Sequence, residues 1–309
     1  MIDPIFLNSP QFECEPLSVA LGCNMLLKLE TANPIRSFKG RGGSLLVMKH
    51  VDGSCERTRP LVSASAGNWG QALAYACRAR SQPLLLFAAE GANRLKLDRM
   101  RALGADVRVT GSDFDSAKLA AERYAVDRGL RFVADGRDIE ASVGAATIGI
   151  ELLRHGPAPD VVLVPLGNGA LLTGVGRWIK AASPRTEVIG VSAAGADAMA
   201  ASWRTNEFVE RVHTETIADG IAVRIPIPEA LADMRGTVDD VILVDDEALI
   251  SAMRLLFTLA GLVIEPAGAA GVAAVWSHGT RFNGHRVATI LCGSNVLPEH
   301  ARDWFTGAV

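Results

Sequence analysis

The sequence predicts an α/β fold with two open, parallel-rich sheets and flanking helices, and three observations carry this prediction. Short apolar runs alternate with longer runs of helical periodicity along most of the chain, as is typical of βαβ units with parallel strands. The 309 residues are 49% hydrophobic, which is enough for one large core or two medium ones. The 30 glycines and several alanine-rich runs suit close packing of helices on strands.

The order of these runs also predicts two domains. Strands are expected at 24–30, 60–64, 83–88, 106–109, 160–164, 187–192, 241–244 and 286–291. Helical patterns lie between them, as over 68–80, 93–103, 113–128, 141–154 and 246–260. This number of strands suits two sheets better than one, and the region from about 60 to 138 has the pattern of four compact βα units. We therefore expect a small α/β domain over 56–138, inserted into a large cofactor-binding domain made of 1–55 and 139–309.

Charge and cysteine usage exclude several classes of function. The net charge of −3 gives no basic surface for nucleic acid or for an anionic membrane. No apolar stretch reaches the roughly 18 residues of a membrane helix, and the first residues lack the pattern of a signal peptide. The five cysteines are scattered and include no CxxC pair, so we expect a cytoplasmic protein with reduced thiols. They are Cys14, Cys23, Cys55, Cys77 and Cys292.

Four loops that follow predicted strands are the candidates for chemistry, because ligands of open parallel sheets bind beyond the carboxyl ends of the strands. They cover 33–43, 63–71, 165–171 and 291–295. In the third loop, two glycines and an asparagine precede a helix, which favours a phosphate site at the helix N-terminus. A plain tight turn is the alternative. In the first loop, Lys39 could be a nucleophile if Phe38 shields it from water and Arg41 lies near it, or an ordinary solvated lysine.

Taken together, the loops resemble a known family. The string Ser37-Phe38-Lys39-x-Arg41-Gly42 resembles the Schiff-base motif of the threonine/serine dehydratases, which are fold type II pyridoxal-phosphate enzymes related to serine racemase. Residues 65–72 resemble that family's asparagine loop, which normally reads S-x-G-N-H-G-Q-A, and residues 216–223 and 265–270 also match in family order. The resemblance spans nearly the whole chain. It implies a tryptophan synthase β-like fold with the cofactor between a large and a small domain, and a homodimer.

The resemblance also implies a role for each matching residue. Lys39 would be catalytic and would bind pyridoxal 5′-phosphate as a Schiff base, with Phe38 packed near the cofactor ring. Asn68 would hydrogen-bond the ring hydroxyl, and Cys292 would face the pyridine nitrogen, where a neutral group favours prompt β-elimination. The phosphate would be bound by Gly167, Asn168, Gly169, Ala170 and Leu171. The substrate carboxylate would be bound by the loop of Ser65, Ala66, Gly67, Asn68 and Trp69.

Several positions depart from the family pattern. Ala66 stands where racemases of the family have the serine that acts as the second acid, so racemisation is not expected. Ser192 and Ala198 replace the carboxylates of the racemase metal site, so we expect no metal. Trp69 replaces the usual histidine, and the usual G-Q-G-T string has Ala145 in place of glutamine. Arg36 stands where glycine is common, either as a solvated side chain or as a cation for a distal group of the substrate.

The expected reaction is therefore the β-elimination, dehydration with deamination, of a small β-hydroxy amino acid such as threonine, serine or hydroxyaspartate. The products would be a 2-keto acid and ammonia. Three different functions stay open: a β-replacement enzyme, a threonine-synthase-like enzyme on the same fold, and an inactive sensor that binds pyridoxal phosphate. Because the last motif lies close to Val309, we also expect no regulatory domain and no control by isoleucine.

Overall fold

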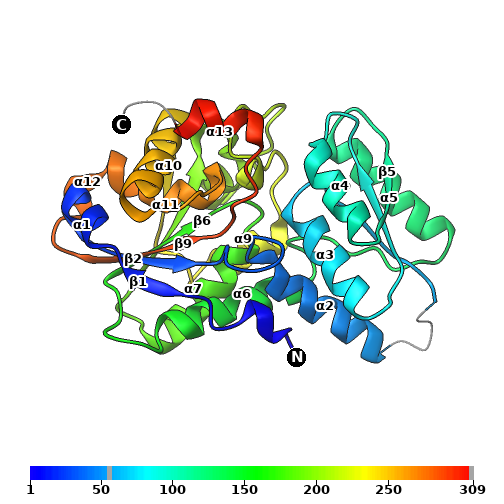
Figure 1. The fold of residues 1–309 in the computed structure, drawn as a ribbon, viewed down its shortest axis with the longest axis horizontal. Helices are drawn as coiled ribbons and strands as arrows, with labels where there is room; N and C mark the ends of the chain where they lie inside the picture. Colours follow the sequence, from blue (N-terminus) through cyan, green and yellow to red (C-terminus); the bar gives the residue numbers. More distant parts are fainter. Residues whose placement is uncertain (54–57, 306–309) are drawn as a thin grey trace. The chain divides into compact units, whose positions relative to one another are not determined.

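The structure, a computed structural model, describes residues 1–53 and 58–305 (Figure 1). The chain divides into two compact units. Unit 1 comprises Met1–Leu7 and Phe38–Gly144, and unit 2 comprises Asn8–Ser37 and Ala145–Val309. Each unit holds one open sheet, so the predicted pair of parallel-rich sheets is confirmed. Unit 1 contains more residues than the inserted domain predicted over 56–138. The predicted boundary at 55/56 lies outside the described residues.

The sheet of unit 2 has six strands in the order β1-β2-β9-β6-β7-β8. They are β1 (Gln11–Glu13), β2 (Asn24–Leu29), β9 (Arg286–Leu291), β6 (Val161–Pro165), β7 (Glu187–Ala193) and β8 (Asp240–Val244). All neighbours are parallel except β1 and β2, which are antiparallel. All residues of β6 are buried, which explains its unbroken apolar run, since parallel strands are covered on both faces. β1 was not predicted, because three partly exposed residues give no readable period.

Helices cover both faces of this sheet. Figure 1 shows α10 (Asp246–Ala260) and α11 (Pro266–Ser277) on one face and α7 (Ala170–Ala182) on the other. A methyl group on Gly271 of α11 would lie 1.9 Å from Oγ1 of Thr289 in β9, so only glycine allows this close approach. The remaining helices and turns are α1 (Glu15–Leu21), η2 (Ala194–Ala196), α8 (Ala198–Thr205), η3 (Asp219–Ile221), α9 (Pro228–Met234), α12 (Gly279–Phe282) and α13 (Pro298–Phe305).

The sheet of unit 1 has three parallel strands in the order β3 (Leu61–Ala64), β4 (Leu84–Ala88) and β5 (Asp106–Val109). The fourth predicted βα unit contributes a single parallel bridge, between Val62 and Phe132. The helices are α2 (Lys39–Gly53), α3 (Asn68–Ala79), α4 (Arg94–Ala102), α5 (Phe114–Asp127) and the first part of α6 (Ile139–Leu152), with η1 (Pro4–Phe6) near the N-terminus.

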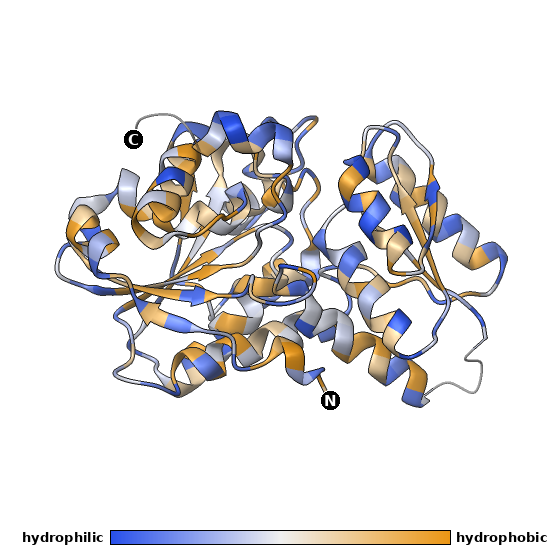
Figure 2. Cartoon of the chain, viewed as in Figure 1, coloured by the Kyte–Doolittle hydropathy of each residue, from blue (hydrophilic) through white to orange (hydrophobic). Residues whose placement is uncertain are grey.

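Hydropathy follows this division into buried strands and exposed helix faces. Figure 2 shows mostly hydrophobic residues along the central strands and mostly hydrophilic residues on α13, in which no described residue is buried. In unit 1, a small core joins β3 and β4 to α5. No helix among the described residues is long and apolar enough to cross a membrane.

Candidate active site

Lys39 is the first residue of α2, in unit 1. Its Nζ lies 2.6 Å from Oδ2 of Asp135 and 4.7 Å from the centre of the Phe38 ring. The Lys39 side chain is 13% exposed, so the amine is largely shielded from water. A fully solvated lysine does not describe this environment. The amine is therefore held in one place, between an aromatic face and a carboxylate, at the start of α2.

Glycines bring the start of α2 close to two neighbouring helices of unit 1. A methyl group on Gly42 would lie 2.7 Å from Cα of Ala141 in α6, and one on Gly43 would lie 3.0 Å from Cβ of Ala72 in α3. From the α6 side, a methyl group on Gly144 would come within 2.5 Å of the Gly42 nitrogen. The first turns of α2, α3 and α6 are therefore in contact, which explains the glycines that follow the lysine.

The asparagine loop follows β3 and is held by one serine. The Oγ of Ser65 accepts hydrogen bonds from the N–H groups of Gly67 (3.2 Å) and Gly70 (2.9 Å). Asn68 begins α3, and the next residue, Trp69, is 3% exposed. A methyl group on Gly67 would meet nothing within 4 Å, so the loop borders open space there. The predicted substrate residues thus form one loop of unit 1, and the Ser65 oxygen stabilises its shape.

Backbone geometry shapes the loop between β6 and α7 in unit 2. Gly169 precedes α7 with φ of +93°, which favours glycine. A methyl group on Gly167 would lie 2.9 Å from the carbonyl oxygen of Gly220. The Oδ1 of Asn168 accepts a hydrogen bond from the N–H of Ala170 (3.1 Å). Because the first turn of a helix offers N–H groups without intrahelical partners, the loop fits a phosphate group. The predicted phosphate residues are contiguous here: Gly167, Asn168, Gly169, Ala170 and Leu171.

Cys292 directly follows β9 and is buried. The residues after it contact the part of the lysine loop that belongs to unit 2, so two of the four predicted loops lie together. Three contacts join them: the antiparallel bridge of Ser37 with Gly293, the N–H of Ser294 to the carbonyl of Arg36 (3.0 Å), and the Nδ2 of Asn295 to the carbonyl of Ile35 (2.9 Å).

Arg36 has an exposed side chain and a φ of +53°. A left-handed backbone explains why glycine is common at this position in the family pattern, since other residues adopt it at a cost of about 1–3 kcal/mol. The exposure favours a solvated guanidinium over a contact with substrate.

Glu265 connects two further strings that the sequence analysis singled out. Its backbone N–H donates to the carbonyl of Gly293 (3.1 Å), and its Oε2 accepts from the N–H of Asn295 (2.9 Å). A methyl group on Gly220 would lie 3.0 Å from Cβ of Ala267 and 3.7 Å from Oε1 of Glu265. Gly220 also lies beside the loop 167–171 between β6 and α7, which we call the phosphate-type loop. The strings 216–223 and 265–270 therefore connect the phosphate-type loop with the Cys292 loop.

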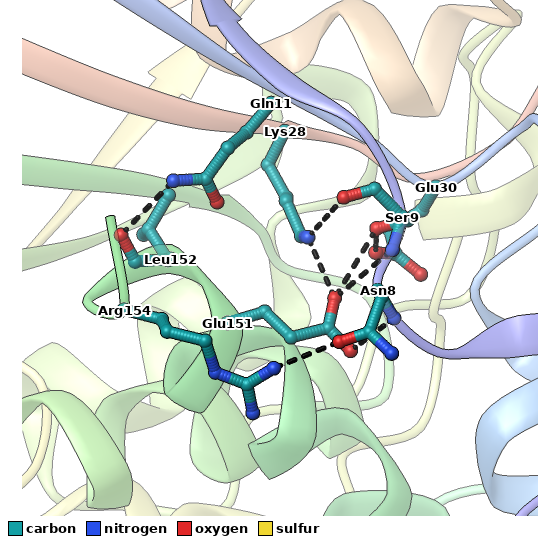
Figure 3. Close-up of polar contacts among 8 residues, drawn as sticks. All are labelled: Asn8, Ser9, Gln11, Lys28, Glu30, Glu151, Leu152 and Arg154. Atoms are coloured by element: carbon teal, nitrogen blue, oxygen red, sulfur yellow. Dashed lines mark hydrogen bonds and ion pairs between the residues drawn. The ribbon is translucent and has the colours of Figure 1, made fainter. Parts of the chain in front are cut away.

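Figure 3 shows a buried polar network of unit 2 that the sequence analysis did not single out. The Nζ of Lys28 on β2 lies 2.6 Å from Oε2 of Glu151 on α6 and donates to the carbonyl of Ser9 (2.7 Å). The Glu151 carboxylate also accepts from the N–H groups of Asn8 (2.8 Å) and Ser9 (3.2 Å), and the Ser9 hydroxyl contacts Glu30. Lys28 is 1% exposed, and a buried charge requires partners of this kind. The network fixes β2, from which the lysine loop departs.

Asp135 is the site residue that sequence reasoning missed. It stands in the string Ala134-Asp135-Gly136, which resembles an ordinary turn. Its one sequence signal is its place just after the apolar residues Phe132 and Val133, which pair with β3. A carboxylate that follows a strand belongs to the class of positions where ligands of parallel sheets bind.

Neither a second nucleophile nor a metal centre emerges from the remaining described residues. Burial raises the pKa of the Cys77 thiol to about 12 and that of Cys23 to about 11, so both stay protonated at neutral pH. Ser192 lies buried in β7 and Ala198 begins α8. In the part of the chain that the structure describes, no three His, Cys, Asp or Glu side chains are grouped to hold a metal ion.

Comparison with known proteins agrees with this geometry. A profile of the family described as pyridoxal-phosphate dependent enzymes matches residues 2–293. The L-threonine ammonia-lyase of Thermotoga maritima is 36% identical over 281 residues, which cover 91% of this chain and 69% of that protein.

Solved structures give the same result. The processed form of threonine deaminase isoform 2 from Solanum lycopersicum is 28% identical with a TM-score of 0.90, covering 97% of this chain and 88% of that one. Maize serine racemase is 25% identical with a TM-score of 0.87, covering 96% and 90%. The chain therefore belongs to the family of pyridoxal-phosphate-dependent enzymes, and within it to the fold type II threonine and serine dehydratases, which are ammonia-lyases.

Proposed function

We propose that the protein dehydrates and deaminates a small β-hydroxy amino acid, such as threonine, serine or hydroxyaspartate, to a 2-keto acid and ammonia. The observation that carries this proposal is the shielded amine of Lys39 at the start of α2, beside the Phe38 ring. Membership of the dehydratase family supports the reaction class, and the intact lysine and phosphate-type loop support use of the cofactor.

The residues present fit pyridoxal phosphate. The loop 167–171 would bind its phosphate through backbone N–H groups, because the first turn of α7 attracts anions. The amide of Asn68 would hydrogen-bond the ring hydroxyl, and the thiol of Cys292 would face the pyridine nitrogen. When bound, the cofactor supplies an electron sink for the negative charge that develops at Cα. A neutral thiol tolerates replacement by a hydroxyl, so Cys292→Ser should keep much of the activity and Cys292→Asp should lose it.

The chain's own groups then account for the reaction. The N–H groups of loop 65–69 would bind the substrate carboxylate and orient its Cα–H bond toward Lys39. The amine of Lys39 takes the Cα proton and becomes an ammonium. The Cβ–O bond breaks, and the hydroxyl leaves as water with a proton from the Lys39 ammonium, which returns the amine to its neutral form. Addition of water to the resulting enamine gives the keto acid and ammonia.

A substrate panel tests the proposal. Purified enzyme is mixed with β-hydroxy amino acids of both configurations, and keto acid and ammonia are measured, with Lys39→Ala as the control. We expect equal amounts of both products from at least one compound and none from the control. If the protein binds the cofactor but releases no keto acid from any compound, the dehydratase is wrong as the proposed function, and the inactive sensor and the two related activities below take its place.

Two related activities on the same fold have different signatures. A β-replacement enzyme would consume O-acetylserine and a thiol to form a thioether without release of keto acid. A threonine-synthase-like enzyme would release phosphate from a γ-phosphorylated substrate. Assays with these compounds separate the three activities.

The homodimer and the cytoplasmic location remain predictions. Light scattering of the purified protein would test the first, and cell fractionation would test the second.

A further inference from the structure

Backbone and side-chain hydrogen bonds within unit 1 hold the loop that carries Asp135. The N–H of Val133 donates to the carbonyl of Val62 (2.8 Å), and the hydroxyl of Ser63 donates to the carbonyl of Val133 (2.7 Å). One residue later, the N–H of Ala134 donates to Oδ2 of Asp138 (2.7 Å). These bonds hold the segment on both sides of Asp135, so its carboxylate occupies a defined place.

That place is at the same edge of the sheet as the asparagine loop. Phe132 pairs in parallel with Val62 of β3, so the chain leaves this segment in the direction in which β3 leads to Ser65. The carboxylate of Asp135 lies 2.6 Å from the Nζ of Lys39, and its side chain is 22% exposed. A charge-assisted hydrogen bond of this length is stronger than one between neutral groups.

We propose that Asp135 is a positioning residue for Lys39, whose carboxylate orients the Nζ and stabilises its ammonium form. A nearby opposite charge favours the charged state of a group. In turnover, this role rests on the proposed function: the proton taken from Cα turns Lys39 into an ammonium, and the fixed carboxylate of Asp135 neutralises that charge. No proton leaves Lys39 in this step, and none is transferred to Asp135.

Several charged groups surround this pair, and most of them form ion pairs of their own. Around the loop, Asp138 pairs with Arg131 (3.3 Å), Arg137 with Glu122 (3.6 Å), and Glu140 of α6 with Lys49 of α2 (3.1 Å). On α2, Arg41 is fully buried two residues after Lys39.

The test measures Lys39 directly in the cofactor-free protein. An acylating reagent labels amines in their neutral form, and peptide mapping measures the rate at which Lys39 is labelled at neutral pH. The variants are Asp135→Asn and Asp135→Ser, which are neutral, and Asp135→Glu, which keeps the charge. Asp106→Asn is the matched control, because Asp106 lies in the same unit with an exposed carboxylate paired with Arg108.

We expect both neutral variants to label Lys39 on the order of tenfold faster at neutral pH, because the amine loses the carboxylate that pairs with it. Asp135→Glu should stay within a few-fold of the parent, and the Asp106→Asn control should match the parent. Equal acceleration in Asp135→Glu would show that Asp135 merely covers Lys39, and unchanged labelling in the neutral variants would exclude any role; either outcome overturns the proposal. Because neither cofactor nor substrate is used, failure here is distinct from failure of the substrate panel.

Discussion

Two loops that each connect a strand to a helix differ in how closely their glycines approach neighbouring residues. The phosphate-type loop of unit 2 and the asparagine loop of unit 1 both follow a buried strand and open a helix. In the first, Gly167 and Gly169 approach neighbouring residues so closely that a methyl group would clash. In the second, Gly67 borders open space, and the hydroxyl of Ser65 holds the loop.

This difference in packing parallels how far each loop keeps the family pattern of residues. A loop whose backbone is in contact with neighbours tolerates few residue types, and the phosphate-type loop keeps its glycines. A loop that borders open space can change its side chains without losing its shape, and Ala66 departs from the pattern there. Trp69 also departs from the pattern, but its side chain is buried. We infer that the cofactor half is fixed by packing and that the substrate half carries the specificity.

The largest expected effect is in the buried network that supports unit 2. Lys28→Met leaves the Glu151 carboxylate buried without its cation, and breaking such a pair costs about 3–5 kcal/mol of unfolding free energy. Lys49→Met in unit 1 is the matched control, because Lys49 is 52% exposed in its pair with Glu140 and exposed pairs contribute about 0–1 kcal/mol. Denaturant unfolding measures both. Equal losses would contradict the buried character of the network.

The second effect compares the two loops through their glycines. Gly169→Ala places a methyl group 2.7 Å from Cβ of Ala230 on a backbone with φ of +93°, and the strained backbone alone costs about 1–3 kcal/mol. Gly67→Ala meets nothing within 4 Å and has φ of −128°, so its cost should stay below about 1 kcal/mol. Thermal unfolding and cofactor titration measure both variants. A larger loss for Gly67→Ala would reverse the comparison.

The third effect concerns the chemistry of the asparagine loop. Ala66 has no proton to give, and a positioned acid is worth about 10²–10⁴-fold in rate, so the parent enzyme should leave the configuration of unreacted substrate unchanged. Ala66→Ser should raise racemisation at least tenfold. Chiral chromatography of residual substrate measures both. If the parent racemises at a rate comparable to keto-acid formation, another group supplies the second proton.

The smallest effect lies at the exposed edge of unit 2, after β7. The hydrogen bond from Arg211 (2.7 Å) lowers the pKa of Asp197. A carboxyl with a lowered folded-state pKa adds stability above its ordinary pKa, and this stability is lost as the pH falls through the folded-state pKa. Arg211→Gln should therefore lower the melting temperature slightly at neutral pH and leave it unchanged in strong acid. A difference that persists at low pH would assign the effect to packing.

Much of the fold could be predicted because it depends on local patterns. The strand over 106–109 and the helix over 246–260 have the predicted bounds, since apolar periodicity and flanking polar residues define them locally. The strand β1 could not be predicted, because it depends on its partner β2 for its hydrogen bonds. In the site, the glycines and Lys39 belong to motifs that the sequence shows directly. Asp135 lies 96 positions from Lys39 in the sequence, so only the folded structure shows that the two side chains are in contact.

The covalent attachment of the cofactor to Lys39 can be measured directly. Borohydride reduction of the enzyme with bound pyridoxal phosphate, followed by peptide mapping, identifies the lysine that holds the cofactor. We predict that the reduced label lies on Lys39 and that Lys39→Ala shows none. A label on any other lysine of the parent enzyme, or no label with the cofactor bound, would show that Lys39 does not have the role assigned to it.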